Sequence, residues 1–211
     1  MIPALVLAAG RSSRMGRAKA TLPVDERDTF LSRIVRTLLA AGVDDVVIVL
    51  GHDANLIAGS FTTSLLPARF ALNREYDRGQ LSSIRTGLAV VDRPGVTAVL
   101  VALVDVPLVA ESTVRAILAR YRETGAPIVR PVHGHRHGHP ILIDRSLFDL
   151  VRSSDDALGL KPIVRAHASA AGDVTVDDEG AFMDIDTIEE YQRAMGARMT
   201  TRTEDSHTAE A

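Results

Sequence analysis

A short stretch between Gly10 and Lys19 concentrates groups that bind anions. It holds two glycines, two serines and four cations, namely Gly10, Arg11, Ser12, Ser13, Arg14, Gly16, Arg17 and Lys19. Glycines let backbone N–H groups turn toward a ligand, and successive N–H groups of this kind form an anion-binding nest. Hydroxyl donors and positive side chains would strengthen such a nest. The stretch therefore predicts a loop that binds a triphosphate.

The spacing of these glycines differs from both common phosphate motifs. A Walker A loop has Gly, four residues and then Gly-Lys-Ser/Thr, whereas five residues separate Gly10 from Gly16. A dinucleotide fingerprint has the pattern G-x-G-x-x-G, whereas Arg11 and Ser12 follow Gly10. On composition alone, an ordinary basic turn after a strand stays open as the alternative interpretation.

Carboxylates that suit a metal ion occur at two further places. Asp105 follows the uncharged run 98–104, and Asp184 and Asp186 point to the same side of an extended chain. Mg²⁺ commonly takes one or two carboxylates together with substrate phosphates. The alternative is structural, because Asp also initiates turns such as the one before Pro107, and Asp186 precedes a helical pattern that it could cap.

Strands that alternate with helices must position these residues. Uncharged runs at 4–9, 46–50 and 98–104 predict strands buried on both faces of a parallel sheet. Shorter strands are expected at 69–73, 127–132, 140–143 and 173–176, and helices around 30–39 and at 54–66, 80–91, 112–123, 145–152, 157–167 and 187–195. This alternation predicts an α/β fold with a mostly parallel sheet and helices on both faces. We expect a single domain over residues 1–196 and a disordered tail over 197–211.

Composition limits the classes of function. Hydrophobic residues make up 46% of the chain, which supports a globular core, and the net charge of −3 gives no basic field for nucleic acid. The chain has no cysteine, which excludes disulfides, thiolate metal sites and a cysteine nucleophile. Neither a signal peptide nor a membrane-spanning segment is expected, so we expect a cytoplasmic protein with no membrane partner.

The segment LAAGRSSRMGRAK resembles the signature L-A-A-G-x-S-x-R-M-G-x-x-K of the MobA-like NTP transferases. The most similar subgroup is the molybdenum cofactor cytidylyltransferases of the MocA type. The resemblance implies a three-layer αβα, Rossmann-like nucleotidyltransferase fold, a loop that wraps a nucleoside triphosphate, and Arg14 and Lys19 on its phosphates. Guanylyltransferases of the family usually read LAGG here, so Ala9 favours CTP.

The resemblance extends to the carboxylates. LVDVP is similar to the family's Asp-x-Pro element, which implies that Asp105 binds Mg²⁺. Met183 to Tyr191 resembles the family's D-I-D-T-P-E-D-Y segment. We expect Asp186 to be the second metal ligand and keep Asp184 as its alternative. Lys19, Arg14 and Asp105 are the expected catalytic residues.

The segment from Asn73 to Leu88 resembles the family's element that ends in G-x-x-x-S-[IL]-R-x-G-L, which holds the base and ribose. Ser82 has a structural alternative as a helix cap. Arg85 has two interpretations, a phosphate contact or an ion pair on the surface. The residues expected to bind the nucleotide are Leu7, Ala8, Ala9, Gly10, Arg11, Ser12, Ser13, Arg14, Gly16, Lys19, Gly79, Gln80, Ser82 and Ser83.

The acceptor side is marked by Gly138-His139-Pro140, which resembles the family's R-x-G-H-P element. It implies that Gly138 and His139 contact the acceptor, a pterin or another phosphate-bearing molecule. Residues 154–161 match the next family element, G-D-x-G-A-R, only loosely. The alternating histidines at 133–139 are compatible with a transition-metal site or with a solvated hairpin tip, and we favour the hairpin.

Together these features predict a Mg²⁺-dependent nucleotidyltransferase that moves CMP from CTP to molybdopterin and releases pyrophosphate, with a molybdoenzyme as a further partner. Three alternatives stay open. One is a related transferase that uses GTP or another NTP, or a sugar phosphate as acceptor. The second is a MobA-like oxidoreductase that uses NAD(P)H, although the dinucleotide fingerprint is missing. The third is a non-catalytic nucleotide-binding protein, which would have no need of Asp105 and Asp186.

Overall fold

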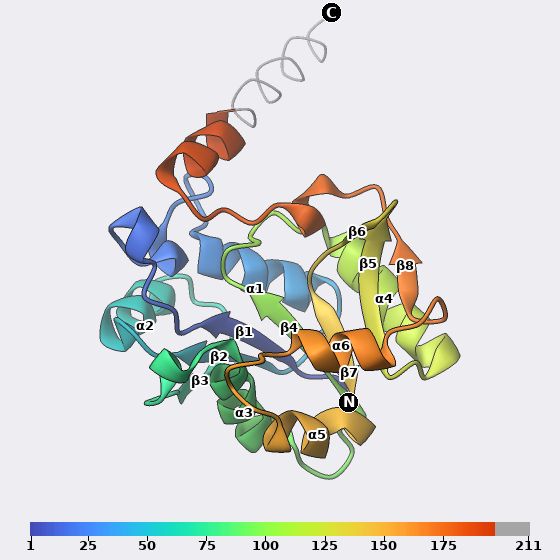
Figure 1. Ribbon diagram of the computed structural model, residues 1–211. Helices are drawn as coiled ribbons and strands as arrows, with labels where there is room; N and C mark the ends of the chain where they lie inside the picture. Colours follow the sequence, from blue (N-terminus) through green and yellow to red (C-terminus); the bar gives the residue numbers. More distant parts are fainter. Residues whose placement is uncertain (197–211) are drawn as a thin grey trace, which may run out of the picture.

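A central sheet with helices on both faces forms the body of the protein (Figure 1). The computed structural model describes residues 1–196, and the tail expected at 197–211 lies outside the described residues. The strands are β1 (Ala4–Ala8), β2 (Val46–Leu50), β3 (Arg69–Leu72), β4 (Ala98–Leu103), β5 (Ile128–His133), β6 (Arg136–His137), β7 (Ile141–Asp144) and β8 (Asp173–Thr175). The three uncharged runs of the sequence are β1, β2 and β4, as predicted.

The sheet is parallel in its first half and mixed in its second. Its strand order is β3-β2-β1-β4-β7-β5-β6, and β8 pairs with β5. Strands β3, β2, β1 and β4 run parallel to one another, so their carboxyl ends lie at one edge. Strand β7 is antiparallel to both β4 and β5. Ligands of open α/β sheets bind outside the carboxyl ends of the strands, which directs attention to the segments after β1, β3 and β4.

The helices divide between the two faces because side chains alternate along each strand. They are α1 (Phe30–Ala40), α2 (Ala54–Thr62), α3 (Gln80–Val91), α4 (Glu111–Thr124), α5 (Phe148–Ser153) and α6 (Lys161–His167), and residues 188–196 form a last helix. Val6 and the other residues on its face of β1 pack against α1, α2 and α4, whereas Leu5 and Leu7 on the opposite face pack against α3, α5 and α6. This confirms the three-layer arrangement.

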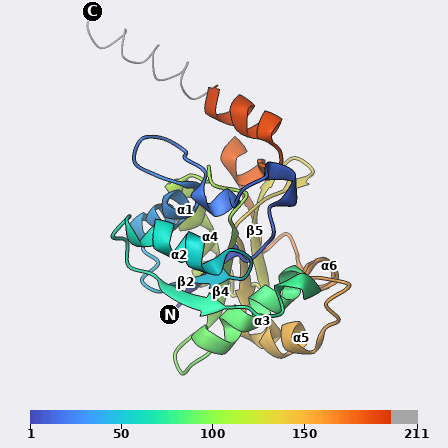
Figure 2. The ribbon, with the colours of Figure 1, turned by 90° about the vertical axis from the view of Figure 1, so that its left-hand side faces the viewer.

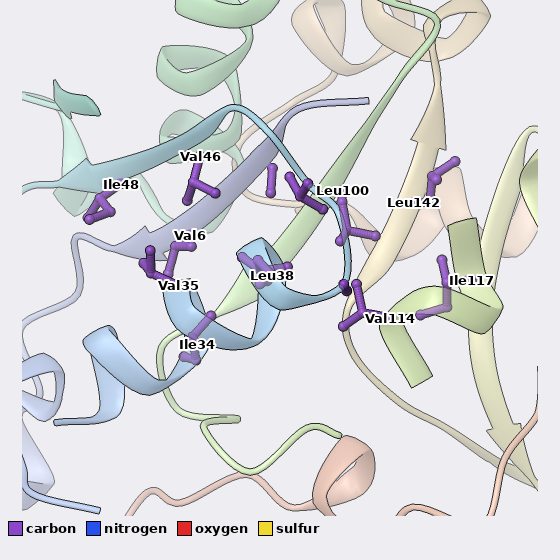
Figure 3. Close-up of a cluster of buried hydrophobic side chains, with 14 of the residues drawn as sticks. Val6, Ile34, Val35, Leu38, Val46, Ile48, Leu100, Val114, Ile117 and Leu142 are labelled. Carbon is purple, nitrogen blue, oxygen red and sulfur yellow. The ribbon is translucent and has the colours of Figure 1, made fainter. Parts of the chain in front are cut away.

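The first of the two cores is visible in Figure 3. Ile34, Val35 and Leu38 of α1 gather with Val6 and Ile48 of the sheet, and α4 adds further side chains beside them. Val6 and Ile48 are 0% exposed. Strands that are buried on both faces fix the positions of the loops at their ends.

Two predicted helices are shorter than expected. The helix predicted at 157–167 begins at Lys161, because Gly159 takes a left-handed conformation with φ 63° and Pro162 suits only a first helical turn. The helix predicted at 54–66 ends at Thr62, and Leu65 is left-handed with φ 56°. The loop that precedes α6 becomes important for the site described next.

Candidate nucleotide-binding site

The loop after β1 is built around Ser12. Ser12 has a left-handed backbone with φ 50°, its carbonyl accepts from the Met15 N–H at 2.9 Å, and its Oγ accepts from the Lys19 N–H at 3.1 Å. Met15 is buried and anchors the short helix η1 (Ser13–Met15). Left-handed serine is uncommon and costs energy, which the surrounding bonds offset. The loop is thereby folded back on itself, as the anion-binding interpretation requires.

Lys19 links this loop to two carboxylates. It begins the short helix η2 (Lys19–Thr21), and its side chain is only 9% exposed. Its Nζ donates to Asp186 and lies 3.4 Å from an oxygen of Asp105. Arg14 adds a second cation, with its guanidinium 2.8 Å from Asp186. Two predicted cations and two predicted acids, from distant segments, therefore form one cluster.

The backbone holds the two acids together. The carbonyl of Asp105, just after β4, accepts from the Ile185 N–H at 2.8 Å, and Ile185 is 0% exposed. Asp186 and Thr187 donate their N–H groups to Glu190, at 2.8 and 2.9 Å. This bond pattern caps the last helix, as the structural interpretation of the segment predicts, and metal binding by Asp186 stays a prediction. Asp186 is placed at the cluster as a result of the cap.

The acids of the cluster have opposite electrostatic environments. A hydrogen bond from Lys19 and the charges of Lys19 and Arg14 lower the pKa of Asp186, despite partial burial. Desolvation, followed by repulsion from Asp105 and Asp186, raises the pKa of Asp184. Asp186 therefore carries its negative charge more readily than Asp184. Asp184 is near enough to feel both carboxylates, but its own side chain is exposed.

The acidic residues fit the oxygen chemistry of Mg²⁺. One oxygen of Asp105 is buried without a hydrogen-bond partner in the described part of the chain. Among residues 1–196, no three histidine or carboxylate side chains are arranged to hold a metal ion by themselves. Mg²⁺ often binds through one or two carboxylates while substrate phosphates complete its shell. Asp105 and Asp186 are suited to that kind of site.

A cavity of about 340 Å³ opens beside the cluster. Its size is within the usual range for small-molecule sites. Its lining includes the predicted residues Leu7, Ala8, Ala9, Gly10, Arg11, Ser12, Ser13, Arg14, Lys19, Gly79, Gln80, Ser83, Asp105 and Asp186. Gly16, Ser82 and Asp184 do not belong to this lining. The structure thus brings most of the predicted residues around one space, from segments after β1, β3 and β4.

Tyr76 lines the same cavity and was missed in the sequence. It lies in η3 (Tyr76–Arg78), and the guanidinium of Arg11 lies 5.6 Å from the centre of its ring. Arg11 also forms two hydrogen bonds of 2.9 Å to Asp77. An aromatic residue just before Gly79 was the available signal. Arg11 therefore connects the phosphate loop with η3 across the opening.

Ser82 and Ser83, at the start of α3, have different surroundings. Both accept a hydrogen bond from the buried Asn73, but Ser83 lines the cavity and Ser82 donates back to the carbonyl of Gly79. Ser82 is not a conventional cap, because α3 has Gly79 as its N-cap residue and no side-chain cap bond. Of the two serines, Ser83 is the one positioned to meet a ligand.

Arg85 does not line the cavity and forms an ion pair, the second of the two interpretations offered for it. Its guanidinium lies 2.6 Å from Asp156 and also donates to the carbonyls of Val151 and Ser154. Arg78, just before Gly79, lies 2.8 Å from the same Asp156. The loop before α6 is thereby attached to both ends of the segment that carries Gly79 and Ser83.

Gly138 and His139 lie behind the site. A Cβ at Gly138 would come within 2.3 Å of the Ala181 carbonyl oxygen, so the two segments touch closely. The His139 N–H donates to the same carbonyl at 2.8 Å. Burial lowers the pKa of His139, and Asp105 opposes that shift. His139 lines a small apolar space with Val106 and does not line the 340 Å³ cavity beside Lys19.

The histidines at 133, 135 and 137 lie in a hairpin, as predicted. Strands β5 and β6 are antiparallel, and residues 134 and 135 form the exposed turn between them. His133 contacts the carbonyl of Val176 through Nδ1 at 3.1 Å. His139 lies beyond the hairpin, near Asp105. Within residues 1–196, these side chains do not converge as a metal site.

A second cavity, of about 670 Å³, includes Asp184 in its lining. It is lined by Leu108, Gly180, Phe182, Met183, Asp184, Glu190, Arg193 and Ala194. Phe182 rests on Gly138, since a Cβ there would meet its ring at 2.8 Å. Asp184 is therefore the residue that connects this cavity with the carboxylates of the first.

Comparison with known proteins identifies the class to which this fold and site belong. The profile of the MobA-like NTP transferase domain matches residues 4–171. The chain therefore belongs to the MobA-like NTP transferase family, and this membership places it among the nucleotidyltransferases.

The relatives of this chain carry different names. It is 32% identical to nicotine blue oxidoreductase of Paenarthrobacter nicotinovorans, over 92% of this chain and 96% of that one. It is 26% identical to a probable molybdenum cofactor guanylyltransferase of Natronomonas pharaonis, over 90% and 95% of the two chains. Rv0371c of Mycobacterium tuberculosis has a similar structure, with TM-score 0.77 and 28% identity over 92% of this chain and 97% of that one. That protein has also been solved in complex with manganese.

No helix among residues 1–196 has the length and apolar character needed to cross a membrane.

Proposed function

We propose that this protein transfers a nucleoside monophosphate, CMP from CTP, to a phosphate-bearing acceptor of the molybdopterin class. The observation that supports this most is the cluster of Arg14, Lys19, Asp105 and Asp186 beside one cavity. A triphosphate needs cations for its oxygens, and a metal ion needs the carboxylates. Ala9 is the reason for choosing CTP over GTP.

The proposed reaction is an in-line displacement. An oxygen of the acceptor phosphate attacks the α-phosphorus of the nucleotide, and the bond from that phosphorus to the bridging oxygen breaks as pyrophosphate leaves. Lys19 and Arg14 would stabilise the charge that develops on the leaving group. A phosphate monoester is already anionic near neutral pH, so catalysis consists of positioning and charge neutralisation. Mg²⁺ on Asp105 and Asp186 would supply further neutralisation of the phosphate charge.

The second cavity is the proposed acceptor side. It borders Asp184, so an acceptor there would lie near the carboxylates of the first cavity. Arg193 offers a cation for the acceptor phosphate, and Phe182 offers a flat apolar surface for a ring. In this proposal Gly138 and His139 act by supporting the wall that carries Phe182. We propose the cytoplasm as the compartment because it supplies NTPs, and we keep a molybdoenzyme as a proposed downstream partner.

A thermal-shift titration tests the nucleotide half first. The protein is mixed with CTP, GTP, UTP or ATP, with and without Mg²⁺. A ligand at one hundred times its Kd adds about 2.7 kcal/mol of apparent stability, so binding is visible. We expect a Mg²⁺-dependent shift that is largest with CTP. A larger shift with GTP or UTP would keep the reaction class and change the donor, and no shift with any NTP would overturn the proposal.

An oxidoreductase that uses NAD(P)H is the second candidate. It is favoured by the 32% identity to a protein named nicotine blue oxidoreductase. The pyrophosphate of NAD(P)H could use the same cations as a triphosphate. The titration therefore includes NADH and NADPH, and a shift with these alone would favour the second candidate over the first.

A further inference from the structure

Asn73 is a buried polar residue that donates hydrogen bonds to two neighbouring serine hydroxyls and so orients them. Its side chain is 3% exposed, at the point where the chain leaves β3. The Glu75 N–H donates to its Oδ1 at 2.9 Å, which fixes the orientation of the amide. Its Nδ2 must then face the other way, where it donates to Ser82 at 2.8 Å and Ser83 at 3.0 Å. Both N–H bonds of the amide are therefore used.

The two serines respond differently to this amide. The Ser82 hydroxyl donates a hydrogen bond to the carbonyl of Gly79 at 2.7 Å, so its proton is already used. Ser83 accepts from Asn73, and its hydroxyl proton has no acceptor among the described residues. The Asn73 N–H occupies one lone pair of its oxygen, so the hydroxyl proton is left free to donate. Ser83 lines the cavity, so that donor is available to a ligand.

The wall that contains Ser83 differs from the wall that contains Lys19 and the carboxylates. Ser83 lines the cavity together with Tyr76, Gly79 and Gln80, from η3 and the start of α3. Lys19 and the carboxylates belong to segments after β1 and β4. An uncharged donor beside an aromatic ring suits the uncharged acceptor atoms of a nucleobase better than a phosphate.

We propose that Asn73 is a positioning residue that fixes the Ser83 hydroxyl as a hydrogen-bond donor to the base of the bound nucleotide. The ligand atom is a carbonyl oxygen or an unprotonated ring nitrogen, such as O2 or N3 of cytosine. This inference rests on the proposed nucleotide binding and adds a residue that does not itself line the cavity.

The variant Asn73→Asp tests the polarity directly. A carboxylate at this place accepts from both serines, so the Ser83 hydroxyl must turn away from the ligand to donate to it. The dissociation constants of CTP and of ribose 5-triphosphate, which lacks a base, are measured by calorimetry with Mg²⁺. We expect Asn73→Asp to raise the dissociation constant of CTP by about tenfold relative to that of ribose 5-triphosphate. This is the scale of one lost hydrogen bond.

Ser83→Ala completes a double-mutant cycle. It removes the donor itself, so we expect a similar loss of affinity for CTP and no change for ribose 5-triphosphate. In the Ser83→Ala background, Asn73→Asp should cause no further loss of CTP affinity. The control is Thr86→Val, which removes a hydroxyl one turn further along α3 that bonds within the helix at 3.0 Å. If Asn73→Asp does not fold, Asn73→Ala frees the Ser83 hydroxyl to rotate, and a CTP-specific loss of about threefold is expected, a fraction of one hydrogen bond.

The outcomes separate this inference from the proposed function. Equal losses for CTP and ribose 5-triphosphate, or additive effects of the two substitutions, would overturn the role of Asn73 while nucleotide binding stands. Failure of the unmodified protein to bind either ligand would overturn both proposals together.

Discussion

Lys19 is held between Asp105 and Asp186 although its side chain is only 9% exposed. A buried cation requires such partners, because removing a charge from water is costly unless it is paired. The same pairing keeps the two acids together. The residues expected to bind phosphate and those expected to bind metal are thus parts of one charge cluster.

Asp105 is the most direct test of the proposed metal role. We expect Asp105→Asn to reduce the Mg²⁺-dependent release of pyrophosphate by about 100-fold or more, the scale for losing one key electrostatic group. The measurement is turnover with CTP and acceptor at saturating Mg²⁺. Asp149→Asn is the control, since its carboxylate is 95% exposed. Turnover near that of the control would remove Asp105 from the mechanism.

Asp28 supports the beginning of α1 through a buried carboxylate. Its side chain is 2% exposed and lies 3.0 Å from Arg36 and from the hydroxyl of Ser32. Burial alone would raise the pKa of Asp28, but the bonds from Arg36 and Ser32 lower it overall. The charged form is therefore part of the folded structure.

The pH dependence of stability follows from that lowered pKa. Asp28 stabilises the fold above its unfolded pKa of about 3.9, and this contribution is lost as pH falls through the lower folded value. We expect Asp28→Asn to lower the free energy of unfolding by about 3 kcal/mol near pH 7, and by less as pH falls below about 3.9. Urea denaturation at several pH values measures this, with the exposed Glu26→Gln as control. A difference that is constant with pH would contradict the assignment.

At the scale of elements, the loop before α6 is tied to η3 and α3 through Asp156. Its carboxylate is 10% exposed and is shared by Arg78 and Arg85. Because Arg78 directly precedes Gly79, this tie reaches the wall of the cavity. The loop and the wall are therefore linked by two ion pairs.

We expect Asp156→Asn to release this tie. Amide exchange of residues 76–83 should become faster, and the free energy of unfolding should fall by about 2 kcal/mol, as for a hydrogen bond to a charged group. Hydrogen exchange followed by mass spectrometry reports the location. The neighbour Asp155→Asn is the control because Asp155 is exposed and its carboxylate accepts from the nearby Ala157 N–H. Faster exchange confined to residues 154–160 would argue against the connection.

The sequence predicted features that depend on residues close together in the chain better than contacts between distant segments. Strands β1, β2 and β4 were found because uncharged runs are local signals. The residues that line the cavity from Leu7 to Arg14 were found because they are consecutive in a motif. The start of α6 was placed too early, since helical periodicity did not reveal the left-handed Gly159. The Asn73 bonds and the contact of Arg11 with Tyr76 were missed, because they depend on how η3 turns back toward the sheet.

At the scale of the whole molecule, the last helix packs against the segment that follows the phosphate loop. Figures 1 and 2 both show residues 188–196 beside the blue segment that joins β1 to α1. Tyr191 donates to the carbonyl of Pro23 at 2.8 Å, and its ring centre lies 5.8 Å from that of Phe30. The family profile ends at residue 171, so this helix and Asp186 lie beyond the matched part.

We expect Tyr191→Ala to affect both stability and ligand binding. Loss of the ring contact and the hydrogen bond should lower the free energy of unfolding by about 2 kcal/mol. CTP should also bind more weakly, since the support of Asp186 and Pro23 is loosened. Denaturation and calorimetry measure the two effects, and the exposed Gln192→Ala on the same helix is the control. A loss of stability with unchanged CTP affinity would show that the helix does not support the site.

The pairing of Lys19 with Asp186 joins residues that are 167 positions apart in the chain. A ribosome adds roughly 5–20 residues per second, so Asp186 is synthesised roughly 8–30 s after Lys19. During that interval the growing chain has its phosphate loop without one of the carboxylates that balance it. The proposed nucleotide site is therefore among the last parts of the protein to be completed, and a chain whose translation stops early carries the motif without Asp186.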